Sequence, residues 1–291
     1  MKRIKQFILW LALVLPCAAQ VLDYDANRRV YWSSGAIYTR DEYHWFVRNT
    51  GQPSRLFLNG VYQSEETGNW DLNMTSAWAI QPNANGVRVA VVDVPGSHAN
   101  RIVQLIQLIA PGAVVTLYPV SRYYPDVVGP MLYNACVSNR IVVLATGWAT
   151  PDLQIEMALH MGSTYAVVVC SAPNNPQSMD VIPDYPYSYH FPNVLAVNAL
   201  DRAGAHYWSG YGVNVIGAPG RNVTGDGVTY SSGCSYAAPI AAGCVALLIA
   251  KKPDRIPRFY VEHALKWSTP AGLTRRINPV AMLTNLRVPE P

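Results

Sequence analysis

The sequence predicts an α/β protein in which a single domain has a mainly parallel β-sheet with helices on both of its faces. Two observations indicate this class. From residue 87 onward, short apolar runs rich in β-branched residues alternate with helix-length amphipathic segments, as in parallel strands that helices cover on both faces. Half of the 291 residues are apolar and only 14% are charged, which excludes a disordered chain and predicts a substantial core.

The predicted elements follow one another in a regular order. The first strand, VRVAVVD, is a mainly apolar run ending in an aspartate, and the segment HANRIVQLIQLIA after it has the pattern of an amphipathic helix. The same criteria predict strands over residues 87–93, 113–120, 140–146, 165–172 and 193–200, and helices over residues 98–110, near 127–138 and near 151–161. In such sheets the catalytic and ligand-binding residues usually lie where strands end and helices begin.

The N-terminal segment, residues 1–19, has the pattern of a signal peptide. Lys2, Arg3 and Lys5 precede an apolar run over residues 7–16, and small residues then stand before Gln20. A membrane anchor is the alternative, but the run falls short of the roughly twenty residues that span a bilayer. A lipoprotein at Cys17 is a weaker alternative, because Pro16 stands where a small residue is expected. We therefore expect an exported protein, extracellular or periplasmic, with no later segment long and apolar enough to span a membrane.

Two further segments complete the predicted organisation. Residues 20–85 are rich in Tyr, Trp, Asn and Gly and have no sustained helical period, so we interpret them as an N-terminal wrap or lead-in segment. Residues 86–291 form the predicted domain. The formal net charge of +4 falls to about +1 without the three N-terminal bases, because 19 bases then face 18 acids. This balance predicts no nucleic-acid partner.

Four cysteines remain after removal of the signal peptide: Cys136, Cys170, Cys234 and Cys244. Export permits disulfides, and four cysteines allow three pairings between which the sequence does not choose. Buried free thiols are the alternative for Cys136 and Cys244. No closely spaced Cys/His pair resembles a zinc site, so we expect no structural metal and no cofactor.

The first candidate site residues are Asp93, at the end of a predicted strand, and His98, at the start of the next helix. A carboxylate beside an imidazole fixes the ring tautomer and stabilises the imidazolium that forms when the ring accepts a proton. The alternative is structural, since an aspartate at a strand end often caps a turn and a histidine in a first helical turn is often solvated.

The second candidate is Ser235, in the segment SSGCSYAAPIAAGCVALLIA, where a glycine-containing turn enters an apolar helix of small residues. A serine at that point lies at the positive end of the helix dipole, and its own N–H can help to bind an oxyanion. A plain N-cap serine is the alternative. Gly233 before it, small residues after it and Pro239 in the first turn favour the catalytic interpretation.

The third candidate is Asn174, in the segment SAPNN after the predicted strand YAVVVC. A side-chain amide at the carboxyl end of a strand can donate a hydrogen bond to a developing oxyanion, and loss of such a donor costs about 3 kcal/mol of barrier. Taken alone, Pro-Asn-Asn-Pro is a turn.

Taken together, the order Asp, His, Asn, Ser resembles that of the subtilisin-like serine proteases. GCSYAAPIAAGCVALL is similar to that family's nucleophile motif, Gly-Thr-Ser-Met-Ala-(Ala/Ser)-Pro followed by an apolar helix. FPNVLAVNALDRAGAHYWSGYGVNVIGAPG resembles the strand, loop and Ala-Pro-Gly passage that precedes the nucleophile. The segments NTGQ, NWDLNMTSAW and GVRVAVVD resemble the lead-in of the kexin-like and related bacterial branches, and RRINPVAML is similar to the C-terminal element. The resemblance covers residues 41–285.

This resemblance implies a serine endopeptidase. Ser235 is then the nucleophile, His98 its general base and later acid, Asp93 the residue that orients His98, and Asn174 the oxyanion donor, with Asn175 as the fallback for that role. No cofactor is implied.

By the same resemblance, Thr146, Gly147 and Trp148, within the segment LATGWA, line the substrate groove and pair with an extended peptide or protein substrate. Acidic residues flank this groove, and one could point into a pocket for a basic side chain. We expect instead that they are solvated loop residues: Asp152, Glu156, Asp180 and Asp184.

Several features depart from the family pattern. Only four residues separate Asp93 from His98, far fewer than in the family, although five residue steps still reach about 17 Å and so permit a hydrogen bond. The family's Asp-(Thr/Ser)-Gly and His-Gly-Thr-His have become DVP and HANR, and Pro173 precedes Asn174. The rival hypothesis is therefore a catalytically inactive protein of the same fold that binds peptides or a protein partner.

A last departure concerns folding. The stretch between Gln20 and the family-like lead-in is too short for the folding pro-domain that many subtilases carry. We therefore expect either unaided folding or a partner such as a folding chaperone or an inhibitor.

Overall fold

The computed structural model describes residues 29–31, 37–39, 45–47, 54–58, 61–66, 70–225 and 230–286. The signal peptide predicted over residues 1–19 lies outside the described residues and stays a prediction. The described parts of the lead-in segment include two short antiparallel pairs, in which β1 (Arg29–Tyr31) pairs with β2 (Ile37–Thr39) and β3 (Ser54–Leu58) with β4 (Val61–Glu66).

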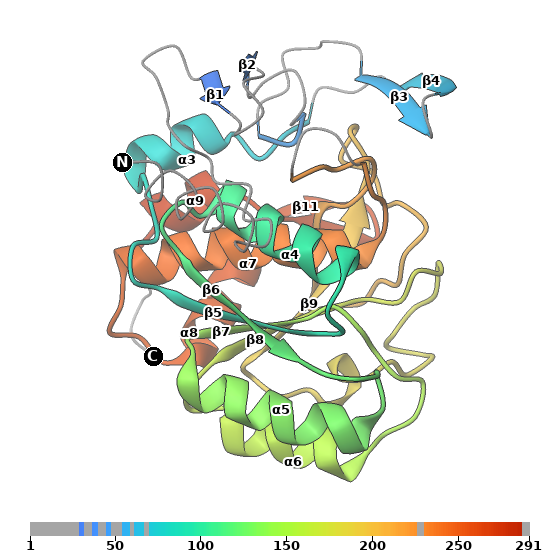
Figure 1. Ribbon diagram of the computed structural model, residues 1–291, viewed down its shortest axis with the longest axis vertical. Coiled ribbons are helices and arrows are strands. Elements are labelled where there is room, and N and C mark those ends of the chain that lie inside the picture. Colours follow the sequence, from blue (N-terminus) through green and yellow to red (C-terminus); the bar gives the residue numbers. More distant parts are fainter. Residues whose placement is uncertain are drawn as a thin grey trace, which may run out of the picture.

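An eight-stranded sheet occupies the centre of the molecule, in the order β11-β12-β10-β9-β8-β7-β5-β6 (Figure 1). All neighbouring strands are parallel except β11 and β12, which are antiparallel. The predicted fold class is therefore confirmed. The strands are β5 (Arg88–Asp93), β6 (Val114–Pro119), β7 (Ile141–Leu144), β8 (Val167–Ser171), β9 (Val194–Leu200), β10 (Val215–Pro219), β11 (Thr269–Ala271) and β12 (Thr274–Arg276).

Helices cover both faces of this sheet, as the sequence predicts (Figure 1). Helices α4 (Ser97–Ile109) and α7 (Cys234–Lys251) pack on one face, and α5 (Pro125–Ser138) and α6 (Leu153–Gly162) on the other. The other helices in the described part of the chain are α3 (Met74–Ile80), α8 (Pro257–Lys266) and α9 (Pro279–Thr284), with a short 3-10 turn, η1 (Tyr187–Tyr189).

The pleat of β5 explains why the run from Val89 to Val92 is apolar at every position. Val89 and Val91 face the core under α4 and α7, whereas Ala90 and Val92 face the core under α5 and α6. All four side chains are at most 1% exposed. Because successive side chains of a strand point to opposite faces, a strand between two helical layers is apolar on both faces along its buried length, here from Val89 up to Asp93 at the strand end.

Helices α4 and α7 approach each other closely because α7 is built from small residues. A Cβ atom at Gly243 would lie only 2.6 Å from the Cβ atom of Ile109 on α4, a distance that real side chains do not tolerate. The two helices lie side by side over the sheet (Figure 1). The amino-terminal turn of each carries a predicted catalytic residue, His98 on α4 and Ser235 on α7.

Helix α7 is also the one described helix with the length and apolarity of a membrane span. The expectation that no later segment has these properties was therefore wrong for Cys234–Lys251. However, 78% of this stretch is buried within the domain. Its apolar side chains fill the core between the sheet and α4.

The structure adds elements that the sequence patterns did not predict. Helix α3 lies in the segment expected to be irregular, and Met74 and Ala77 on it are fully buried in the main core. With seven residues this helix is too short to produce a sustained period. Strand β10 contains a glycine and a proline, and β11 and β12 have three residues each, so that none of them has a continuous β-branched run.

The four cysteines Cys136, Cys170, Cys234 and Cys244 are all free and buried. None of the three pairings that the sequence left open is formed among them. Burial raises the pKa of Cys136, Cys234 and Cys244 to about 12, which makes these thiols unreactive at neutral pH.

Candidate active site

The predicted catalytic residues gather where parallel strands end and helices begin. Asp93 ends β5, Asn174 follows the end of β8, and His98 and Ser235 lie in the first turns of α4 and α7. The carboxyl ends of parallel strands lie at the same edge of a sheet, so residues far apart in the chain come close together at this edge.

Asp93 and His98 form a hydrogen bond despite the short connection between them. The imidazole Nδ1 lies 2.7 Å from Asp93 Oδ2, and because an ionised carboxylate only accepts hydrogen bonds, Nδ1 carries the proton. Asp93 is 1% exposed and the side chain of His98 is 32% exposed, so the pair is anchored in the interior and opens to solvent on the histidine side. The four-residue connection is therefore compatible with an oriented imidazole.

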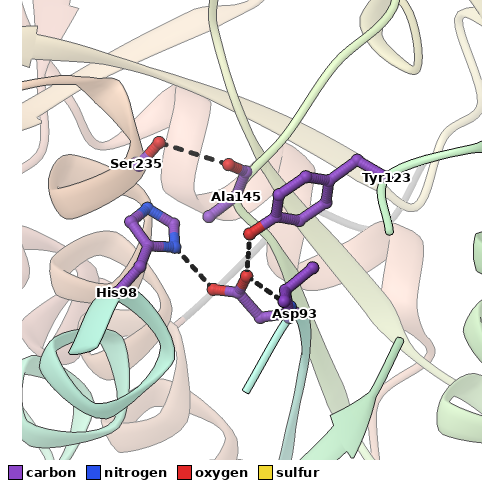
Figure 2. Close-up of polar contacts among 6 residues, drawn as sticks. Asp93, His98, Tyr123, Ala145 and Ser235 are labelled. Carbon is purple, nitrogen blue, oxygen red and sulfur yellow. Dashed lines mark hydrogen bonds and ion pairs between the residues drawn. The ribbon is translucent and has the colours of Figure 1, made fainter. Parts of the chain in front are cut away.

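Ser235 lies next to this pair, and its hydroxyl has a different partner. Ser235 Oγ donates to the carbonyl oxygen of Ala145, 3.2 Å away, and no hydrogen bond joins it to His98 among the described residues. Figure 2 shows the second ring nitrogen of His98 facing Ser235. Rotation about the Cα–Cβ bond of Ser235 moves the hydroxyl between staggered positions, and catalytic hydrogen bonds are often long before substrate binds.

Asn174 contacts the start of the helix that carries Ser235. Its Oδ1 accepts a hydrogen bond from the N–H of Cys234, at 2.8 Å, which leaves the Nδ2 donor without a partner among the described contacts. The fallback residue, Asn175, instead donates through Nδ2 to Gln177 Oε1, at 2.9 Å on the exposed surface. The geometry therefore favours Asn174 over Asn175 as the donor to an oxyanion beside Ser235.

Gly233 makes the contact between Asn174 and α7 sterically feasible. Its φ angle of +134° lies in a region that favours glycine, and a Cβ atom there would lie 3.1 Å from Asn174 Oδ1. The N–H of Ser235 is one of the first amides of α7, which have no acceptor within the helix, and no described hydrogen bond takes it. Two unpartnered donors, Asn174 Nδ2 and the Ser235 N–H, are thus available.

The predicted groove residues follow directly after β7. Thr146 and Trp148 are half-buried and Gly147 is exposed. Trp148 already pairs with Tyr185, because the N–H of each residue donates to the carbonyl of the other at 2.9 and 2.8 Å. Of the three residues, only Thr146 and Gly147 have main-chain groups without partners in the described hydrogen bonds, so an added peptide strand can pair only with them.

Asp184 lies under this segment, and the expectation that it is solvated was wrong. It is 8% exposed, and a Cβ atom at Gly147 would lie 2.9 Å from its Oδ2. Burial raises the pKa of this carboxyl from 3.8 to about 6. The local sequence, a polar turn between prolines, did not indicate that the chain folds back against Gly147 and covers the carboxylate.

Two aromatic residues at the site were not predicted from the sequence. Tyr123, in the loop between β6 and α5, donates its hydroxyl proton to Asp93 Oδ1 (Figure 2). Tyr236 packs edge-on against the His98 ring, with centroids 5.5 Å apart. Tyr236 follows Ser235 directly and could have been proposed from its position, whereas no sequence pattern connects Tyr123 with a residue thirty positions earlier.

The subtilase family model matches residues 80–279, well over half of the chain. No curated protein sequence matches at a significant level.

Three solved structures illustrate the structural similarity. The nisin leader peptidase NisP from Lactococcus lactis has a TM-score of 0.64 at 16% identity, over 72% of this chain and 90% of that chain. MycP1 with its N-terminal propeptide removed gives 0.63 at 19% identity, over 75% and 96% of the two chains. A cold adapted subtilisin-like serine proteinase gives 0.61 at 14% identity, over 82% and 98%.

At these identities the structural neighbours show a shared fold, and the match to the family model carries the assignment. The mostly parallel sheet with helices on both faces agrees with the fold of these neighbours. The chain belongs to the subtilase family of serine proteases.

Proposed function

We propose that this protein is an exported serine endopeptidase that hydrolyses peptide bonds through Asp93, His98 and Ser235. The observation that carries the proposal is the 2.7 Å hydrogen bond between His98 Nδ1 and Asp93 Oδ2, which leaves the other ring nitrogen free to accept a proton on the side of Ser235 (Figure 2). Membership of the subtilase family supports a protease. Export is supported by the signal-like pattern of residues 1–19.

The reaction begins with a rotation of the Ser235 side chain away from Ala145. The hydroxyl then gives its proton to His98 as Ser235 Oγ attacks the peptide carbonyl carbon. Asp93 stays ionised and stabilises the imidazolium. The carbonyl oxygen, now an oxyanion, accepts hydrogen bonds from Asn174 Nδ2 and from the Ser235 N–H.

The second half of the reaction uses the same groups in reverse. His98 gives its proton to the departing amine, which breaks the peptide bond and leaves an acyl ester on Ser235. Water then attacks the acyl carbonyl carbon as His98 takes one of its protons, and His98 returns that proton to Ser235 Oγ as the ester bond breaks and the acid is released. The unpartnered main-chain groups of Thr146 and Gly147 are suited to hold the peptide in extended form during both steps.

One observation favours a second candidate function, a peptide-binding protein without turnover. Among the described contacts, the Ser235 hydroxyl donates a hydrogen bond to the Ala145 carbonyl oxygen and makes none to His98. If that contact persists, the base cannot activate the serine, while the groove can still hold a peptide. The two candidates share the fold and the groove and differ only in whether Ser235 becomes nucleophilic.

Labelling with a fluorophosphonate probe separates these candidates. We expect the purified mature protein to be labelled, and the labelling to disappear in Ser235→Ala and in His98→Ala. A folded protein that stays unlabelled at high probe concentration would contradict the peptidase and leave the binding function. Cleavage of unstructured proteins by the wild type, and not by Ser235→Ala, then establishes peptide-bond hydrolysis.

A further inference from the structure

The second oxygen of the catalytic carboxylate has a partner that comes from outside the expected motifs. Asp93 Oδ2 is bound to His98, and Asp93 Oδ1 accepts hydrogen bonds from the Val94 N–H, at 2.7 Å, and from the hydroxyl of Tyr123. Tyr123 lies in the loop after β6, thirty residues later in the chain. Figure 2 shows its ring extending from that loop toward the carboxylate.

The short connection between Asp93 and His98 explains why a distant donor matters. Within the connection, only the Val94 N–H binds the carboxylate among the described contacts. Asp93 is 1% exposed, so water cannot readily replace a missing donor, and a buried carboxylate with an unsatisfied oxygen is costly. Without Tyr123, Oδ1 would keep a single donor and the carboxylate plane would be less constrained.

The Tyr123 hydroxyl is a dependable donor. Burial raises the pKa of Tyr123 to about 12, and the hydrogen bond to Asp93 and the negative charge of Asp93 act in the same direction. The phenol therefore keeps its proton throughout the neutral and mildly alkaline range. A neutral O–H donor binds the carboxylate without adding a positive charge that would compete with the imidazolium.

The backbone of Tyr123 is fixed by the predicted groove. Its carbonyl oxygen accepts a hydrogen bond from Trp148 Nε1, at 3.0 Å, and the main chain of Trp148 is in turn paired with Tyr185. The side chain of Tyr123 thus contacts Asp93 while its backbone contacts the wall of the groove. One residue connects the carboxylate with the segment that would hold substrate.

We propose that Tyr123 is a positioning residue of the catalytic triad, which holds the Asp93 carboxylate at the angle at which it orients His98. The inference rests on the proposed peptidase function for its effect on rate. It acts through Asp93 and His98, because the Tyr123 hydroxyl touches the carboxylate and not the unpartnered groups of Thr146 and Gly147. Among the described contacts, no side chain of the short Asp93–His98 connection binds the carboxylate, and Tyr123 in the loop after β6 supplies that hydrogen bond.

The test compares Tyr123→Phe with the matched control Tyr124→Phe. Both changes remove one hydroxyl, but Tyr124 is 59% exposed, its ring lies under Arg122, and none of the described contacts joins it to Asp93. We expect Tyr123→Phe to lower kcat about 10- to 100-fold, since small misplacements of a catalytic group have effects of this size. KM should stay within about 2-fold, because uniform substrate binding is not altered. Equal kcat values for Tyr123→Phe and the wild type would overturn the proposal.

A spectroscopic measurement keeps this test separate from the test of the peptidase. The proton on His98 Nδ1 has an NMR resonance that depends on its hydrogen bond to Asp93, whether or not the protein turns over substrate. We expect Tyr123→Phe to shift this resonance and Tyr124→Phe to leave it in place. If the wild type is inactive but the shift occurs, the peptidase proposal fails and the positioning role stands. An unshifted resonance in folded Tyr123→Phe contradicts the positioning role.

A second variant covers the case in which Tyr123→Phe does not fold. Trp148→Phe removes the Nε1–H that binds the Tyr123 carbonyl and leaves Tyr123 itself unchanged. It should shift the His98 Nδ1 proton resonance away from its wild-type position. An unshifted His98 Nδ1 resonance in folded Trp148→Phe would show that the loop does not position the Asp93 carboxylate.

Discussion

The role of Asn174 can be tested with a change that removes its donor and retains its acceptor. In Asn174→Asp the side chain keeps its shape, and an oxygen still accepts the hydrogen bond that Asn174 Oδ1 now takes from the Cys234 N–H at 2.8 Å. The amino group Nδ2 is lost and a negative charge stands near the developing oxyanion. Of the two expected oxyanion donors, only the Ser235 N–H remains.

Removal of one such donor costs about 2.7–4 kcal/mol of barrier, which corresponds to a factor of about 10²–10³ in kcat. The measurement is kcat on a peptide substrate, with Asn175→Asp as the control, because Asn175 lies on the surface and bonds to Gln177. We expect the control to retain activity and both variants to keep their melting temperatures. Asn174→Asp with kcat within about 3-fold of the wild type would refute the assignment of the oxyanion donor.

A further variant separates the two halves of the Asn174 side chain. Asn174→Ala also removes the acceptor for the Cys234 N–H, and loss of a contact of this capping type costs about 1 kcal/mol. For a domain of this size that lowers Tm by about 2–4 °C. The expected order of stability is therefore wild type and Asn174→Asp above Asn174→Ala, whereas the expected order of activity places both variants far below the wild type.

Three other properties should follow from the structure. Because burial raises the pKa of Asp184 from 3.8 to about 6, the folded state binds its proton more tightly, and stability is lost as the pH rises from about 4 to 6. Asp184→Asn should therefore raise Tm at pH 7.5 and leave it nearly unchanged at pH 4, with a gain of about 3 kcal/mol at most. Equal effects at both pH values would contradict burial as the cause. Gly233→Ala should destabilise the fold by more than about 1 kcal/mol and slow fluorophosphonate labelling. The reason is that the φ angle of Gly233 is +134° and the new methyl group would press on Asn174 Oδ1. Unchanged labelling would show that this turn tolerates a side chain. The four buried cysteines should resist a thiol reagent in the folded protein and all react after denaturation without reductant; fewer than four reactive thiols would reveal a disulfide.

Much of the fold could be predicted because its strands are buried on both faces. The uninterrupted run that ends at Asp93 and the β-branched run of β8 come within two residues of the observed strands. Elements without such runs were missed. Strand β10 contains Gly217 and Pro219, and α3 has only two turns, so that tertiary contacts and not local patterns determine their conformation.

The candidate site was predictable where it consists of short motifs and unpredictable where it depends on the path of a loop. Asp93, His98 and Ser235 stand at element ends, where the residue type itself indicates a role. Tyr123 and Asp184 reach the site from loops whose composition is ordinary, and their contacts to Asp93 and beside Gly147 arise only from the folded path. A single sequence carries no signal for such contacts.

The close packing of α4 against α7 has a consequence for how the reaction rate of this protein can change during evolution. His98 and Ser235 are carried by two helices that pack closely at Gly243 and Ile109, about 12 Å along α7 from Ser235 at 1.5 Å per residue. A methyl group added at Gly243 would push the two helices apart and alter the approach of His98 to Ser235 without touching either residue. Selection for activity at a different temperature could therefore act on an interior contact that no substrate ever reaches.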